Sequence, residues 1–120
     1  MVNYKPYRYV KGENPAVDAD FAAASLYEKI RPGKDGIFWK SGLRWYRIPL
    51  TNVQRIFRRV EPVYGRLCCG GRSFIIEWLV LVLNDGSELV LHIGDDVPKS
   101  AEALLQRLQN QHPQIQYGKV

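Results

Sequence analysis

The chain has 120 residues, 46% of them hydrophobic and 24% charged, with a formal net charge of +5. This length suits one domain, over residues 1–120, whose core needs no disulfide staples, and the composition is that of an ordinary globular protein. The longest purely apolar run, residues 78–83, is far too short for a membrane-spanning helix, and no signal-peptide pattern follows Met1. We therefore expect a soluble, cytoplasmic protein.

The first thirty residues carry mixed signals. Residues 1–16 are polar, contain two prolines and predict an N-terminal arm or an edge strand. Within them, "YKPYRYV" alternates tyrosines with basic residues, as a segment on a sheet edge or on a ligand would. Alanines and Asp20 favour a helix over residues 20–30. The turn sequence "RPGKDG" follows at once, however, and we expect a strand over residues 25–30.

The segment from residue 25 to residue 93 predicts a meander of antiparallel strands. Short runs rich in β-branched and aromatic residues, such as "GIFWK", "RWYRIPL" and "VQRIFRRVEPV", are separated by turn sequences. In "RWYRIPL", Tyr46, Ile48 and Leu50 share one face, while Trp45 and Arg47 share the other. After the tight turn "NDG", the strand "SELVLHI" points Leu89, Leu91 and Ile93 inward.

One predicted strand, residues 72–83, is apolar on both faces except at Glu77. We expect Glu77 to pair with Arg55 or Arg59 or to lie on an exposed outer face; a tuned acid is the alternative. The second apolar face needs a cover, since one face of a lone antiparallel sheet should be polar. The cover is either the arm, through Tyr4, Tyr7 and Tyr9, or a second copy of the chain. We expect a homodimer through the strand from Phe74 to Leu83.

The last element is a predicted amphipathic helix over residues 97–110. Val97, Ala101, Leu104, Leu105 and Leu108 form one apolar stripe, which needs a sheet to cover. Asp95 and Asp96 precede the helix, where acids suit its dipole, and Pro98 lies in its first turn. Pro113 marks the region where the helix must have ended, and residues 113–120 form a tail.

A strand meander closed by one C-terminal helix resembles the pleckstrin-homology (PH) layout. The segment "FWKSGLRWYRIPLTNVQRI" is similar to a pattern of bacterial PH-like domains, in which a hydrophobic strand ends in Ile48, Pro49 and Leu50 with Val53 beyond. The resemblance covers residues 25–110. It implies a mainly β fold in which two near-orthogonal antiparallel sheets form an open barrel capped by the helix. It also implies a non-catalytic module that binds a protein or an anionic ligand.

Positive charge is concentrated in residues 37–66, which hold seven basic residues and one acid, a balance of +6. Such a segment suits an anionic or peptide partner, unless it is only a solvated strand face. Nucleic acid is the alternative partner, with bases stacked on Trp39, Trp45 and Tyr46. The predicted binding residues are Lys40, Arg44, Arg47, Arg55, Arg58 and Arg59.

The two cysteines, Cys68 and Cys69, are adjacent and lie among glycines between two predicted strands. Metal binding needs about four ligands, usually with paired cysteines two residues apart, and no second pair exists. We predict reduced thiols in a turn. The alternative, and the third function class, is a reactive thiol or redox switch with His92 as base. Phosphate-loop, dinucleotide and zinc-protease motifs are missing, so no catalytic residue, metal or cofactor is predicted.

Overall fold

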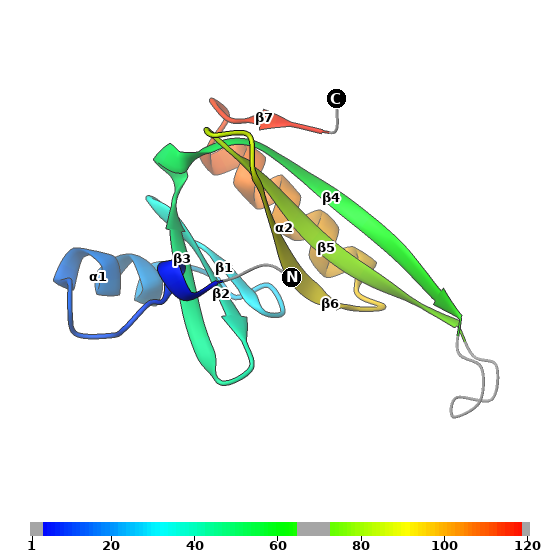
Figure 1. The fold of residues 1–120 in the computed structure, drawn as a ribbon, viewed down its shortest axis with the longest axis horizontal. Helices are drawn as coiled ribbons and strands as arrows, with labels where there is room; N and C mark the ends of the chain where they lie inside the picture. Colours follow the sequence, from blue (N-terminus) through cyan, green and yellow to red (C-terminus); the bar gives the residue numbers. More distant parts are fainter. Residues whose placement is uncertain (1–3, 65–72, 119–120) are drawn as a thin grey trace.

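The computed structural model describes residues 4–64 and 73–118, and these form two separate sheets and two α-helices (Figure 1). The first sheet has the order β1-β2-β3 and the second the order β6-β5-β4-β7. Neighbouring strands are antiparallel except β4 and β7. The fold is therefore mainly β, as predicted, and the two sheets do not close into one barrel. The elements are η1 (Lys5–Tyr7), α1 (Pro15–Ala23), β1 (Ile30–Pro32), β2 (Gly36–Ser41), β3 (Arg44–Pro49), η2 (Leu50–Asn52), β4 (Val53–Tyr64), β5 (Ser73–Leu83), β6 (Glu88–Asp95), α2 (Pro98–Gln111) and β7 (Gln116–Tyr117).

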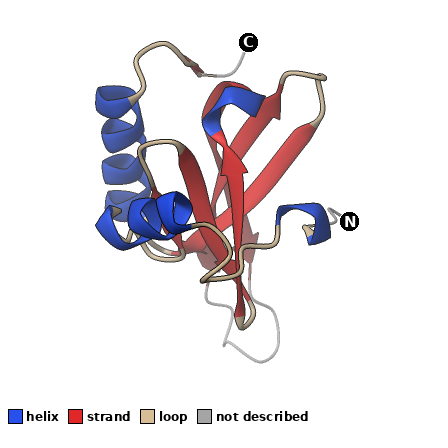
Figure 2. Ribbon diagram, turned by 90° about the vertical axis from the view of Figure 1, so that its left-hand side faces the viewer, coloured by secondary structure: helices blue, strands red, loops and turns tan. Residues whose placement is uncertain are grey.

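The core lies between the inner faces of the two sheets and α2, which runs alongside the strands (Figure 2). Strand alternation explains its composition. Leu89, Leu91 and Ile93 of β6 are buried as predicted, and they join the inner residues of β2, β3 and β5. The apolar stripe of α2 completes the cluster with three buried residues, Ala101, Leu104 and Leu108. The predicted helix over residues 97–110 is confirmed with a shift of one residue.

The N-terminal region differs from the prediction, because the strand expected over residues 25–30 is absent. Ahead of that segment the chain forms α1, which begins at Pro15 after Asn14 and ends at Ala23. The side chain of Asn14 accepts hydrogen bonds from two backbone amides of the first turn, a standard N-cap. After the helix, reciprocal backbone hydrogen bonds join Tyr27 and Ile30 in a tight turn, so β1 begins only at Ile30.

A long hairpin of β4 and β5 forms the centre of the second sheet and projects beyond α2 (Figure 1). Its register places Arg58 opposite Leu79 and Val60 opposite Glu77, so Arg58 and Glu77 are diagonal neighbours on one face. Arg55 and Arg59 point to the other face. The expected partner of Glu77 was therefore wrong: the arginine is Arg58, and Glu77 is fully buried.

The predicted tail is built into the fold over the residues that the structure describes. Ile115 is buried in the core, and Gln116 and Tyr117 form β7 against the start of β4. The Tyr117 hydroxyl lies 2.8 Å from the carbonyl oxygen of Leu108 and 2.9 Å from that of His112, at the C-terminal end of α2. Neither described helix is long and apolar enough to cross a membrane.

Candidate binding groove

The six predicted binding residues do not form one surface. Lys40, Arg44 and Arg47 belong to β2 and β3 of the first sheet. The other three, Arg55, Arg58 and Arg59, lie on β4 of the second sheet. A basic run that is continuous in the sequence is thus divided where the chain passes from one sheet to the other.

The three β4 arginines already have partners in the chain. Arg58 makes two short hydrogen bonds to the Glu77 carboxylate, at 2.7 and 2.9 Å, and these bonds raise the pKa of the arginine. Arg59 lies 3.6 Å from Glu88. Arg55 donates to the Gly118 carbonyl oxygen at 2.9 Å and to the Gln116 side chain at 2.5 Å. Arg55 and Arg58 therefore hold the second sheet together.

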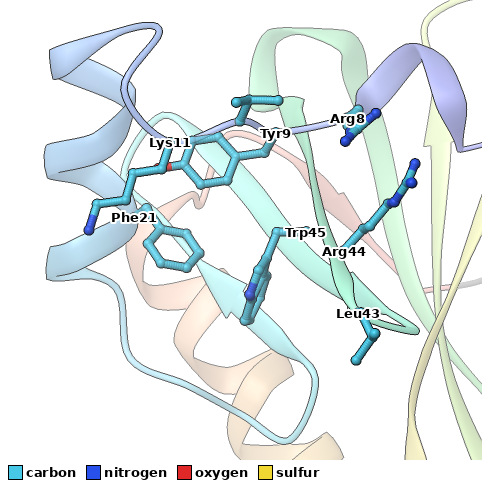
Figure 3. A pocket seen from close by; sticks show the side chains of 8 residues that line it. Arg8, Tyr9, Lys11, Phe21, Leu43, Arg44 and Trp45 are labelled. Atoms are coloured by element: carbon cyan, nitrogen blue, oxygen red, sulfur yellow. The ribbon is translucent and has the colours of Figure 1, made fainter.

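A groove of about 430 Å³ lies between the N-terminal segment and the turn that joins β2 to β3 (Figure 3). Its lining contains three cationic side chains and three aromatic rings but no carboxylate. Figure 3 shows Phe21 on one side of Trp45 and Arg44 on the other. The groove is lined by Arg8, Tyr9, Val10, Lys11, Phe21, Leu43, Arg44 and Trp45.

The N-terminal segment is held beside β3 as an added edge. The Tyr9 amide donates to the Trp45 carbonyl oxygen at 3.0 Å, and Arg8 bridges Tyr46 in antiparallel fashion. The Tyr9 hydroxyl donates to Asp18 of α1 at 2.6 Å, and burial followed by this hydrogen bond raises the pKa of Tyr9 to about 12. One wall of the groove is therefore fixed both to the sheet and to the helix.

An aromatic cluster supports the groove from below. The Phe21 ring of α1 packs against Tyr9, Phe38 and Trp45 with centroid distances of 5.0 to 5.1 Å. The Arg31 guanidinium lies 4.3 Å from the centre of the Phe21 ring, a favourable cation–π contact. This cluster covers the outer face of the first sheet and adds one more positive charge beneath the groove.

Exposed apolar side chains border the groove. Leu43 is 95% exposed at the tip of the β2–β3 turn, and Val10 is 41% exposed. Lys40 is exposed on the same sheet face, directly opposite Trp45. Arg47 is half-buried, with its guanidinium 5.8 Å from the Phe38 ring, and lines a smaller cavity of about 180 Å³ beside the N-terminal segment.

Of the predicted residues, only Arg44 lines the main groove directly. Arg8 and Lys11 were missed because the prediction concentrated on residues 37–66. The alternation of tyrosine and basic residues in "YKPYRYV" pointed to Arg8, and Lys11 follows that segment directly. The predicted sharing of one face by Trp45 and Arg47 is consistent with the register of β2 and β3.

Cys68 and Cys69, on which the cysteine hypothesis depends, lie outside the residues that the structure describes. Its proposed base, His92, is half-buried on β6, 3.0 Å from Asp95 and 3.2 Å from the Lys29 amine. Among residues 4–64 and 73–118, no three side chains of the metal-binding types gather closely enough to hold an ion.

Comparisons with known proteins identify no family for the chain. No protein-family model matches the chain, and no curated protein or solved structure is significantly similar to it.

Proposed function

We propose that the protein is a non-catalytic, cytoplasmic binding module whose groove takes an acidic protein segment. The observation that carries this proposal is the lining of the groove, with three cations and no carboxylate around aromatic rings. Arg8, Lys11 and Arg44 attract carboxylates, and the bidentate guanidinium geometry suits them. Trp45 and the exposed Leu43 offer apolar contact to a side chain between the acids.

The aromatic arrangement favours a protein partner over nucleic acid. Stacking of bases needs free ring faces. Trp39 is 1% exposed, and its ring stacks on Tyr46 with a centroid distance of 5.7 Å. Two of the three rings expected to stack bases are therefore engaged with each other, which leaves Trp45.

The resemblance to PH-like domains belongs to the same proposal. Two mainly antiparallel sheets packed with a helix near the C-terminal end of the described chain support it. The added N-terminal segment and α1 lie outside the pattern that carries the resemblance, and they build one wall of the groove. A PH-like domain would thus present a binding surface on the outside of its first sheet.

Fluorescence anisotropy with a labelled copolymer of glutamate and tyrosine tests the proposal. We expect binding that weakens as salt rises, because the contacts are exposed ion pairs. Reversing one groove charge, in Arg44→Glu or Lys11→Glu, should weaken binding by about tenfold or more, equivalent to about 1.4 kcal/mol. Lys99→Glu, which makes the same charge change on α2, is the matched control and should bind almost as the wild type.

Two outcomes would contradict the proposal. Equal weakening by Lys99→Glu and Arg44→Glu would mean that the copolymer senses only net charge. A single-stranded oligothymidylate that binds more tightly than the copolymer, with loss in Trp45→Ala, would favour the nucleic-acid alternative.

A further inference from the structure

The outer edge of β4 is mostly unpaired within the described chain. β7 covers only its first part, where Gln116 and Tyr117 pair with Arg55 and Ile56. Beyond the Gly118 amide, which donates to the Ile56 carbonyl oxygen, no described strand continues along this edge. The free stretch is residues 58–63, in the second half of β4.

Strand alternation determines which backbone groups this edge offers. The Ile56 carbonyl points outward to Gly118, and the backbone groups of every second residue must therefore do the same. Arg58 and Val60 each present an N–H and a C=O group, whereas Pro62 presents only a C=O group. Proline occurs here at the position where its missing N–H is not needed by β5.

We propose that this edge pairs with the same edge of a second copy of the chain, antiparallel and centred on Val60. In this register Val60 lies opposite Val60 of the second copy, and the two residues exchange both backbone hydrogen bonds. The Arg58 amide donates to the Pro62 carbonyl oxygen of the second copy, whereas the Arg58 carbonyl oxygen keeps water as its partner because Pro62 has no N–H group. Arg59 lies opposite Glu61, and two-fold symmetry makes this ion pair twice.

Other registers of the two edges are less favourable in charge, in backbone hydrogen bonding or in the space that β7 leaves. Moving one copy's strand by two residues along the other places either Arg59 opposite Arg59 or Glu61 opposite Glu61, depending on the direction. Like charges directly opposite each other are destabilising. A larger shift toward the hairpin tip sets Pro62 against Pro62, where neither residue has an N–H group to donate. A larger shift the other way runs into β7 at Ile56. Of these registers, the one centred on Val60 places opposite charges across the edge and keeps Val60 paired through both of its backbone groups.

The side chains along the edge suit this partner. Val60 is 45% exposed and Ile75, on the same face of the neighbouring strand, is 39% exposed. Pairing would bury the two valines against each other and continue the sheet across both copies. Glu61 is exposed and accepts a hydrogen bond from the Trp78 indole at 3.1 Å, which fixes the carboxylate beside the edge. A dimer through the broad face of β5 remains the earlier prediction, and the charge pattern favours the adjoining edge.

Charge exchange provides the first test, by sedimentation of the full chain in reducing buffer at micromolar concentration. The wild type should be a dimer. Arg59→Glu and Glu61→Arg each create two like-charge contacts and should raise the dissociation constant of the dimer by about tenfold or more. The double variant carrying both changes restores opposite charges and should restore the dimer. Lys99→Glu is the control for net charge and should leave it unchanged.

Cross-linking provides the second test, in a background where Cys68 and Cys69 are serine. Val60→Cys places one thiol at the two-fold axis, so a short bismaleimide should join two copies in high yield. Val10→Cys has a comparably exposed position far from this edge and should stay monomeric under the same reagent. A monomeric wild type with no cross-link at position 60 would overturn the proposal. A dimer insensitive to both charge reversals but lost in Ile76→Lys would overturn it in favour of the face of β5.

Discussion

At the scale of single residues, the Arg58–Glu77 pair is the interaction whose loss we expect to lower the free energy of unfolding most. Glu77 is fully buried, and its two carboxylate oxygens accept from two nitrogens of one guanidinium. A buried ion pair contributes little net stability compared with apolar residues, because both ions lose water. Removal of one partner is different, since it leaves the other charge buried and unpaired.

Arg58→Ala should therefore lower the free energy of unfolding by about 3–5 kcal/mol. The neighbouring Arg59 supplies a matched control, because its contact with Glu88 is exposed and 3.6 Å long. Arg59→Ala should cost no more than about 1 kcal/mol. Urea unfolding measures both values. Similar values for the two variants would mean that Glu77 finds water or another partner when Arg58 is removed.

The sequence identified Glu77 as the exceptional residue of its strand but not its partner. Three arginines lie within five positions on β4, and which of them faces Glu77 depends on the pairing register. A bulge between Val53 and Arg55 shifts that register, and no local pattern reveals it.

At the scale of elements, α2 is the one whose packing was predictable residue by residue. Its stripe repeats at helical spacing, and Leu104 is fully buried in the core. Leu104→Ala should cost about 2–5 kcal/mol in urea unfolding, the usual range for a large-to-small change at a buried site. Gln109→Ala on the exposed side should change stability by less than about 0.5 kcal/mol. A cost below about 0.5 kcal/mol for Leu104→Ala would mean that α2 does not fill the core.

The helix α1 was not predictable in the same way. It has no buried residue within its bounds and no apolar stripe, so its sequence lacks the period that identified α2. Its position depends on tertiary contacts, namely Phe21 against the aromatic rings of the first sheet and Asp18 against Tyr9. Asp20 adds a further link, because its carboxylate accepts from the Lys34 and Asp35 amides.

At the scale of the whole molecule, two tyrosines at opposite ends of the described chain link stability to alkaline pH. Burial raises the pKa of Tyr117 to about 12, and burial together with Asp18 raises that of Tyr9 to about 12, from the ordinary value of 10.0. A raised pKa in the folded state means that the unfolded chain loses its proton first. The stabilisation is complete below pH 10 and is lost as pH rises toward 12.

We therefore expect the free energy of unfolding to fall between pH 10 and pH 12. The double variant Tyr9→Phe, Tyr117→Phe should be less stable at neutral pH, because each hydroxyl donates a hydrogen bond, and its stability should decline less steeply in this range. Denaturant unfolding at several pH values measures both effects. Equal slopes in the two proteins would show that other groups cause the alkaline loss.

The groove was predictable only in part, because it is assembled from three places in the chain. Arg44 and Trp45 come from β3, Phe21 comes from α1, and the remaining wall comes from the N-terminal segment. Strand alternation predicted the neighbours within the first sheet. It carried no information on which separate segment would cover the outer face of that sheet, since this depends on contacts between residues far apart in sequence.

The buried ion pair of β4 and β5 also has a consequence for how the chain finds its fold. Both faces of β5 are apolar, so a slip of one residue would exchange two hydrophobic faces and leave the pattern almost intact. Only Glu77 makes the two faces unequal, because a slip of one residue would move its carboxylate to the face of Arg59 and break its two hydrogen bonds with Arg58. We expect slipped hairpins to be short-lived for this reason. A single charged residue would then favour the native strand register over slipped registers during folding, before the core forms around the two strands.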